Sequence, residues 1–225
     1  MTTMLHVYVD NIIFTASDAA FLENIILRLG SAFAIKDLGP LNLFLGIQVV
    51  RTRAGLSLSQ RHYISSLLEC DKMQQCKPLV TPMSTSTKLH KNDSPHFHDP
   101  SLYRHIVGAL QYFTLTRPDL SFVVNKVCKY MHNPSVNQWA VVKRILRYLQ
   151  YTKDMCLFIP KFDTKFFQAF TDADWAGSLD DKKSTGGYAI FMGSALVSWS
   201  SKKQCTVARP STESEYKALA DEPPS

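Results

Sequence analysis

The sequence predicts an α+β protein, and three observations support that class. Two β-rich runs flank the pair Asp10-Asn11, helical spacing of apolar residues dominates positions 101–151, and a period of two prevails from Met155 onward. Hydrophobic residues make up 45% and charged residues 20% of the 225 positions, which is typical of a folded chain. This length allows one large domain or two small ones.

The first predicted element is a hairpin over residues 5–15 with Asp10 and Asn11 at its tip. Its strands are too apolar to face water on both sides, so we expect at least one face to be buried. A carboxylate on a rigid turn is well placed to hold Mg²⁺, which tolerates little error in the geometry of its oxygen ligands. The alternative is an ordinary hairpin in which Asp10 and Asn11 only make the turn.

The spacing of apolar residues predicts the remaining elements. Ser17 is expected to cap the first helix, with Asp18 favourably placed in its first turn. Four prolines among polar residues mark positions 77–100 as a linker, the clearest boundary in the chain. The expected elements are a helix from Ser17 to Gly30, strands over 43–50 and 55–59, helices over 61–73, 101–114, 118–132 and 136–151, strands over 156–159, 166–172, 187–192 and 195–199, and a helix from Ser211.

Basic residues gather at two of these places. Arg51 and Arg53 lie in the turn between two predicted strands, and Lys143, Arg144 and Arg147 cluster on one side of the helix over 136–151. Contacts to phosphate groups need only such a row of cations. The alternative in both places is a solvated surface, since exposed hairpins and helices routinely carry such charges.

A series of short motifs connects the sequence to a known family. Tyr8-Val9-Asp10-Asn11 is similar to the Tyr-Val-Asp-Asp catalytic turn of reverse transcriptases. The motifs that follow, in order, are Lys36-Asp37-Leu38-Gly39-Pro40, Phe44-Leu45-Gly46-Ile47, Leu58-Ser59-Gln60, Tyr63-Ile64, Ile106-Val107-Gly108-Ala109-Leu110-Gln111-Tyr112, Thr116-Arg117-Pro118-Asp119-Leu120, Asp172-Ala173-Asp174-Trp175-Ala176-Gly177, Ser198-Trp199-Ser200-Ser201-Lys202-Lys203-Gln204 and Ser211-Thr212-Glu213-Ser214-Glu215-Tyr216.

Together these motifs resemble the C-terminal part of the Pol polyprotein of copia-type LTR retrotransposons, in which reverse transcriptase runs into RNase H. The resemblance extends to about residue 220, and it includes the short open reading frames derived from such elements in plant genomes, mitochondrial ones among them. It implies the end of a reverse transcriptase palm and the start of a thumb over 1–76, a linker over 77–100, a helical thumb or connection over 101–153, and a truncated RNase H-like mixed sheet with a helix over 154–225.

The resemblance implies a polymerase site that is incomplete in this chain. The family uses three aspartates and two Mg²⁺ ions, one aspartate from an earlier strand and two from the hairpin turn. Asp10 matches the first turn position, whereas Asn11 stands at the second and brings no negative charge. The earlier strand does not occur in the sequence, so we expect no polymerase activity from this chain alone.

The implied RNase H site uses the same two-metal chemistry, with Asp172, Glu215 and two later acidic residues as ligands. The sequence stops before either later residue. Asp174 is expected in the turn after the strand, and Glu213 on a different side of the helix from Glu215, so neither replaces a missing ligand. The expected catalytic residues are therefore Asp10 and Asn11 in the polymerase site and Asp172 and Glu215 in the RNase H site. Of these, Asp10, Asp172 and Glu215 are the expected metal ligands.

The implied partners are an RNA–DNA hybrid or a primer–template, in addition to upstream segments of Pol that would complete the fold. In reverse transcriptases the hairpin that corresponds to residues 43–59 grips the end of the primer. The residues expected to contact nucleic acid are Tyr8, Arg51, Arg53, Lys143, Arg144, Arg147, Lys202 and Lys203. Three hypotheses follow: a silent catalytic relic, a nucleic-acid-binding module without catalysis, and one part of an enzyme that a partner completes.

The overall charge and the N-terminal sequence indicate the kind of partner and the cellular compartment to expect. A formal charge of +6 and a pI near 9.0 fit a nucleic-acid partner, although many metabolic enzymes are as basic. No run of apolar residues reaches the length of a membrane helix, and no basic leader precedes Arg28. Five scattered cysteines indicate reduced thiols. We expect an intracellular protein of the cytoplasm or nucleus, or of mitochondria if it is encoded there.

Overall fold

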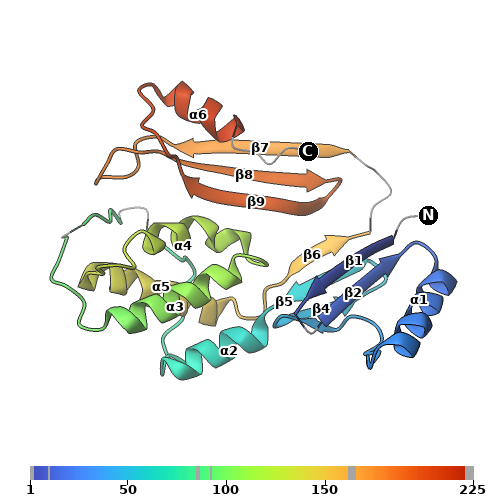
Figure 1. Ribbon diagram of the computed structural model, residues 1–225. Coiled ribbons are helices and arrows are strands. Elements are labelled where there is room, and N and C mark those ends of the chain that lie inside the picture. The colour runs from blue at the N-terminus through green and yellow to red at the C-terminus, as the bar shows by residue number, and fades with distance from the viewer. Residues whose placement is uncertain (1–2, 10, 85–86, 92, 162–165, 221–225) are drawn as a thin grey trace. The chain divides into compact units, whose positions relative to one another are not determined.

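The computed structural model describes residues 3–9, 11–84, 87–91, 93–161 and 166–220. It contains helices and antiparallel sheets, which confirms the predicted α+β class (Figure 1). The chain divides into two compact units, Met1–Phe44 and Leu45–Ser225. Within the described residues, no helix is long and apolar enough to cross a membrane.

The first unit is built on the predicted hairpin. Strands β1 (Thr3–Tyr8) and β2 (Asn11–Ala16) pair in antiparallel register, with Tyr8 opposite Asn11. The prediction that one face of this hairpin is buried was wrong for β1, because all six of its residues are exposed. A two-stranded sheet with one neighbouring helix offers too little surface to cover a face.

Helix α1 (Ala19–Ala32) follows the hairpin, and the short strand β3 (Leu43–Phe44) ends the unit. The N-cap of α1 is Asp18 and not Ser17 as expected, since the Asp18 carboxylate accepts a hydrogen bond of 2.9 Å from the amide of Ala20. The helix continues past Gly30 to Ala32, and it has no fully buried residue.

The second unit opens with an antiparallel sheet in the order β4 (Ile47–Arg51), β5 (Gly55–Ser59) and β6 (Leu157–Pro160). A single strand was expected over 43–50, but Leu45 and Gly46 both have positive φ angles, 48° and 77°, and break it. At Gly55 a Cβ atom would collide with the carbonyl oxygen of Ile159, so the pairing of β5 with β6 depends on a glycine there.

The core of this unit is helical. Its helices are α2 (Arg61–Cys70), α3 (Pro100–Phe113), the 3₁₀ turn η1 (Pro118–Leu120), α4 (Ser121–Cys128) and α5 (Val136–Tyr151). These elements confirm the four predicted helices, although α2 ends earlier than expected and the helix over 118–132 is divided into η1 and α4. Fully buried side chains of the core include Ile64, Leu68, Tyr103, Ile106, Leu110, Phe113, Leu120, Ile145, Leu146 and Leu149.

The segment predicted as a linker packs against these helices. Phe97 is 5% exposed and stacks on Trp139 of α5, with ring centroids 4.6 Å apart. Asp93 accepts a hydrogen bond from the hydroxyl of Ser135, and Gln138 donates one to the carbonyl of His90. The proline-rich composition therefore does not make this segment a detached tether.

The C-terminal part consists of the antiparallel sheet β7 (Phe167–Asp174), β8 (Thr185–Met192) and β9 (Ala195–Lys203), followed by α6 (Ser211–Ala220). Strand β7 continues through Asp174, so the prediction of that residue in a turn was wrong. The pairing with β8 persists to Thr185 and keeps the strand extended.

A buried polar network joins the helices at one corner of the second unit. Arg117, 3% exposed, donates two hydrogen bonds to the Asp119 carboxylate, at 2.9 and 2.7 Å, and two more to the backbone carbonyl and the hydroxyl of Thr152. The hydroxyl of Tyr148 donates to the same carboxylate at 2.8 Å. The end of α3 is thereby fixed to the end of α5.

The network predicts a cost for removing the carboxylate. In Asp119→Asn the charge of Arg117 stays buried without its counter-ion, so we expect the free energy of unfolding to fall by about 2 kcal/mol, between the values for exposed and for buried pairs. Urea denaturation measures this. The matched control is Asp154→Asn, because Asp154 forms an exposed pair with Arg61 at 3.1 Å and should change stability by less than about 0.5 kcal/mol.

The loss of stability in Asp119→Asn depends on pH. Burial raises the pKa of Asp119, but the hydrogen bond and charge of Arg117 outweigh it and hold the pKa below its ordinary value. A lowered folded pKa contributes stability above the unfolded pKa of about 3.9 and loses it as pH falls through the folded value. The difference between the native protein and Asp119→Asn should therefore shrink below pH ~4. An undiminished difference there would contradict the ion-pair interpretation.

Candidate functional site

The turn between β1 and β2 is the first candidate site. Val9 has a φ of 48° and is 80% exposed, and its neighbour Tyr8 lies opposite Asn11 in the strand register. A β-branched residue with positive φ costs about 1–3 kcal/mol and is typical of tight turns at functional sites. Tyr8 contacts Phe44 edge-on, with ring centroids 6.4 Å apart. Asp10, the predicted catalytic aspartate, lies outside the described residues.

The described part of this turn does not provide a site for two metal ions. Asn11 opens β2 as an exposed residue, and its amide oxygen is a neutral ligand. Two divalent cations close together need several carboxylates to offset their charge and dehydration. The amide at position 11 therefore weakens the turn as a metal site whatever Asp10 contributes.

The second candidate site contains Asp172 on β7. Ala173 pairs with Gly186, where an added Cβ would lie 3.2 Å from the Cβ of Ala218 on α6, so α6 covers the Ala173 side of the strand. Alternation along the strand then places Asp172 and Asp174 on the opposite face, where both are exposed. Glu215, the second predicted ligand of the RNase H site, is on α6. Asp172 and α6 therefore lie on opposite faces of β7.

Neighbouring carboxylates at this site pair with cations. Asp174 lies 3.8 Å from the ammonium group of Lys126, and Glu213 accepts from Lys217 at 2.6 Å and from the amide of Arg209 at 2.8 Å. These hydrogen bonds lower the pKa of Glu213, with Lys217 the largest influence. In the part of the chain that the structure describes, no three histidine, cysteine or acidic side chains form a group that could hold a metal. The residues present do not fit a two-metal centre.

Arg53 lies in the exposed turn, as predicted, whereas Arg51 is the last residue of β4 and pairs with Leu56. The turn is fixed by Thr52, whose amide donates to the carbonyl of Gly55 at 2.8 Å and whose hydroxyl accepts from the Gly55 amide at 3.1 Å. Both arginine residues are exposed on this rigid support. Their arrangement suits contacts with phosphate groups, and their role in binding nucleic acid remains a prediction.

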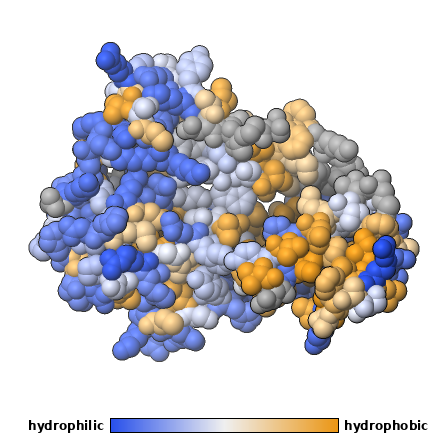
Figure 2. Space-filling model, viewed as in Figure 1, coloured by the Kyte–Doolittle hydropathy of each residue, from blue (hydrophilic) through white to orange (hydrophobic). Residues whose placement is uncertain are grey.

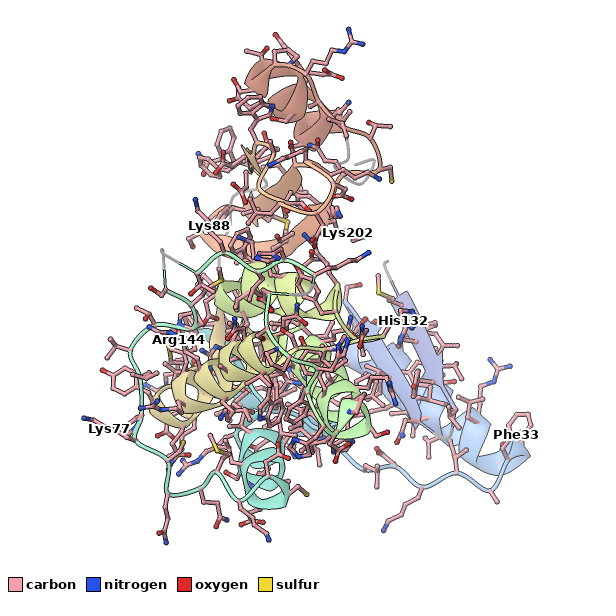
Figure 3. The ribbon with its side chains drawn as sticks, turned by 90° about the vertical axis from the view of Figure 1, so that its left-hand side faces the viewer. Phe33, Lys77, Lys88, His132, Arg144 and Lys202 are labelled. Carbon is pink, nitrogen blue, oxygen red and sulfur yellow. The ribbon has the colours of Figure 1, made fainter. Side chains whose placement is uncertain are left out.

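Two of the three basic residues predicted on α5 bind the chain's own backbone and side chains. Residues 74–84, 87–91 and 93–97, which we call the strap, run along this helix (Figure 3). Arg147 donates to the carbonyl of Lys77 at 2.6 Å, and Arg144 donates to the hydroxyl of Thr81 at 2.7 Å. Lys143 is exposed. Arg144 and Arg147 thus have a structural role beside their predicted one.

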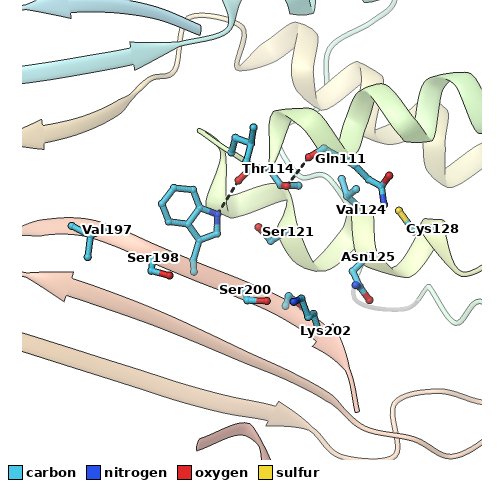
Figure 4. A pocket seen from close by; sticks show the side chains of 13 residues that line it. Gln111, Thr114, Ser121, Val124, Asn125, Cys128, Val197, Ser198, Ser200 and Lys202 are labelled. Atoms are coloured by element: carbon cyan, nitrogen blue, oxygen red, sulfur yellow. Dashed lines mark hydrogen bonds between the residues drawn. The ribbon is translucent and has the colours of Figure 1, made fainter. Parts of the chain in front are cut away.

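Lys202 and Lys203 occupy different environments at the end of β9. Lys203 forms an ion pair with Asp181 at 2.5 Å, whereas Lys202 lines a groove of about 470 Å³ between β9 and helices α3 and α4 (Figure 4). Within the groove the indole N–H of Trp199 donates to the carbonyl of Thr114 at 2.9 Å. This bond joins the C-terminal sheet to the helices, and Lys202 remains the more accessible cation of the two.

Comparisons with known proteins identify the family. Residues 2–85 match the family model described as "Reverse transcriptase (RNA-dependent DNA polymerase)". The chain is 46% identical over 217 residues to an uncharacterized mitochondrial protein of Arabidopsis thaliana, and the match covers 96% of this chain and 90% of that relative. The chain belongs to the reverse transcriptase family of copia-type retrotransposon Pol proteins. The predicted resemblance is confirmed.

The chain spans a small part of the longer relatives that it matches. It is 46% identical over 215 residues to the retrovirus-related Pol polyprotein from transposon RE2 of Arabidopsis thaliana, a match that covers 96% of this chain and 15% of the relative. It is 36% identical to the corresponding polyprotein from transposon TNT 1-94 of Nicotiana tabacum, of which it spans 17%. No solved structure matches the chain.

Two of the family motifs, Leu58-Ser59-Gln60 and Thr116-Arg117-Pro118-Asp119-Leu120, have a structural role that the sequence did not reveal. Thr116 donates to the side chain of Gln60 at 2.7 Å, and Gln60 donates to the carbonyl of Tyr112. With the Arg117–Asp119 pair, these bonds explain both motifs as parts of one buried network. In the sequence, the only signal was the charged run Arg117-Pro118-Asp119 between two predicted helices. That run does not reveal that Arg117 binds Thr152 or that Thr116 binds Gln60.

The contacts of the strap lead to a testable prediction. In Arg147→Ala the hydrogen bond to Lys77 is lost, so we expect faster amide hydrogen exchange over residues 74–81 with the core helices unchanged. Mass spectrometry of peptic fragments measures this. The control is Lys143→Ala on the same helix, whose side chain is exposed. Equal exchange in both variants would contradict the role of Arg147 in holding the strap.

Proposed function

We propose that this chain forms the part of a copia-type Pol protein that joins the end of the reverse transcriptase domain to an RNase H-like region. The identity of 46% over 96% of the chain to the RE2 polyprotein is the observation that carries this proposal. The strand order β7-β8-β9 followed by α6 supports it, because three antiparallel strands and a helix open an RNase H-like fold. In this proposal residues 1–76 belong to the reverse transcriptase palm and thumb, 77–100 to a linker, 101–153 to a helical connection and 154–225 to the RNase H-like region.

We further propose that the chain binds a primer–template or an RNA–DNA hybrid. The formal charge of +6 supports attraction to phosphate groups. Arg51 and Arg53 supply exposed cations beside and in a fixed turn, and Lys202 supplies another at the groove beside β9. Tyr8 ends β1 at the hairpin turn, opposite Asn11 of β2. These positions suit backbone contacts, which position a nucleic acid without reading its sequence.

Catalysis by the chain alone is not part of the proposal. Reverse transcriptases use divalent metal ions, and Mg²⁺ is the expected one, since it activates the attacking oxygen in two-metal phosphoryl transfer. Asn11 is neutral, and Asp172 lies on the face of β7 opposite α6, which carries Glu215. Neither arrangement suits two metal ions. The chain therefore acts by binding, and any chemistry belongs to a larger assembly.

The test combines activity and binding on one labelled RNA–DNA hybrid. With Mg²⁺ present, we expect neither primer extension nor RNA cleavage above the level of the Asp10→Ala and Asp172→Ala variants. Binding should weaken with salt along a straight log–log line. Arg51→Ala and Arg53→Ala should each lower that slope by about 1. The matched control is Arg104→Ala, an exposed arginine on α3 outside the proposed interface.

Two results would overturn these proposals separately. Extension or cleavage that either aspartate variant abolishes would mean that the metal site assembles despite Asn11 and the position of Asp172. Binding that is insensitive to salt, or that falls equally in the Arg104 control, would remove the proposed interface. A folded chain is verified in each case by its circular dichroism.

A second candidate function is assembly with an upstream segment of Pol. Figure 2 shows apolar residues gathered where Figure 1 draws β1, β2 and α1. Within this first unit, Leu5 is 54%, Val7 59% and Ile12 45% exposed, and the strand register places the three on one face of the hairpin. An exposed apolar face of this kind is typical of an interaction surface.

Co-expression with the upstream reverse transcriptase segment of the RE2 relative tests this assembly. We expect the two to co-purify and the amides of residues 3–16 to gain protection from hydrogen exchange. Val7→Lys should prevent both effects by placing a charge in the interface. The control is Leu38→Lys, because Leu38 is 74% exposed in the loop after α1. Retained association in Val7→Lys would contradict the assignment of this face.

A further inference from the structure

A cavity of about 610 Å³ lies between the strap and α5. Asn137, Ala140, Val141 and Arg144 contribute to its wall from successive turns of one helix face. The strap closes the opposite side. Met73, Leu79 and Leu89 add apolar side chains to the lining, and Thr87 adds a hydroxyl group. The wall is therefore partly apolar, with polar and charged groups around it.

The charge of this cavity is strongly one-sided. Four cations, Lys88, Lys143, Arg144 and Arg147, line it together with a single carboxylate, Asp93. Among the described residues, none of the four cations forms an ion pair with a carboxylate. The Asp93 carboxylate already accepts from the hydroxyl of Ser135 at 2.5 Å. Uncompensated positive charge in a concave site attracts anions more strongly than the same charge on an open surface.

Arg144 adds an independent observation. One of its guanidinium nitrogens donates to Thr81 at 2.7 Å, but its Nε is buried and has no hydrogen-bond partner in the described structure. A buried donor without a partner costs about 1–3 kcal/mol. An anion bound beside the guanidinium would compensate its charge. The guanidinium is already oriented by Thr81, which reduces the entropy lost on binding.

We infer that this cavity binds phosphate groups. Several convergent cations suit an anion with several charged oxygens, and guanidinium groups match phosphate oxygens through paired hydrogen bonds. The cavity has room for more than one phosphate, and its apolar wall suits an attached uncharged group. The phosphate comes from a free phosphate anhydride or from a nucleic-acid backbone. The inference goes beyond the proposed function, because neither Lys88 nor the cavity takes part in it.

Titration calorimetry of the full chain with inorganic pyrophosphate tests the inference. Saturable binding at one site is expected, with affinity that falls as salt rises. Lys88→Ala and Lys143→Ala should each weaken binding by about fivefold, the scale of an exposed charge contact. Both side chains are exposed, so the fold should be unaffected.

Lys77→Ala is the matched control. Lys77 lies on the same strap but does not line the cavity, and its side chain points away from α5 (Figure 3). Its carbonyl, which accepts from Arg147, is retained in the variant. We expect pyrophosphate affinity equal to that of the native chain. Absence of saturable binding, or equal weakening in Lys77→Ala and the two cavity variants, would overturn the inference.

Competition distinguishes the two sources of phosphate. If the RNA–DNA hybrid displaces pyrophosphate and the cavity variants weaken hybrid binding, the cavity holds a backbone phosphate. If both ligands bind at once, it holds a free anhydride. Either result supports the site. Pyrophosphate binding that survives in a chain with no affinity for the hybrid separates this inference from the proposed function, since it supports the first while the second fails.

Discussion

The buried guanidinium of Arg117 is the constraint on which the helical core depends. An arginine side chain keeps its proton under all ordinary conditions, so the fold must supply acceptors for it. Asp119 and Thr152 do so, and Tyr148 of α5, the helix that Thr152 caps, donates a hydrogen bond to the carboxylate. Gln60 and Thr116 extend the network to the start of α2. Two stretches of sequence, 117–119 and 148–152, thus meet around one charge, and the bond between Gln60 and Thr116 joins the start of α2 to the segment beside them.

This arrangement gives a physical reason for the family motifs of the second unit. Residues that carry the resemblance to Pol proteins need not take part in chemistry, because a polar network inside an apolar core is intolerant of substitution. Arg144 and Arg147 extend the same principle to the surface, where cations that suit phosphate groups also hold the strap. The basic residues of α5 therefore hold the strap against the helix, and the cavity lies between the two.

Much of the fold could be predicted from the sequence where local signals are strong. Helix α5 has the expected bounds, and its start is fixed by the capping box of Ser135 and Gln138 after Pro134. The break at Leu45-Gly46 and the extension of β7 through Asp174 depend on strand pairing, which local sequence does not reveal. The candidate sites were predictable as motifs. The face of β7 that carries Asp172 depends on where α6 packs, and that is a tertiary property.

The pairing of β5 with β6 has a consequence for synthesis of the chain. Ser57 is opposite Phe158, about a hundred residues later, and the whole helical core lies between them. Closing so long a loop is slow, because the entropy of bringing the strands together is lost before their contacts form. While the ribosome is still adding the helices, β5 presents an unpaired edge that can join another nascent chain. The close pairing at Gly55 therefore forms only after the helical core between the two strands has been synthesised.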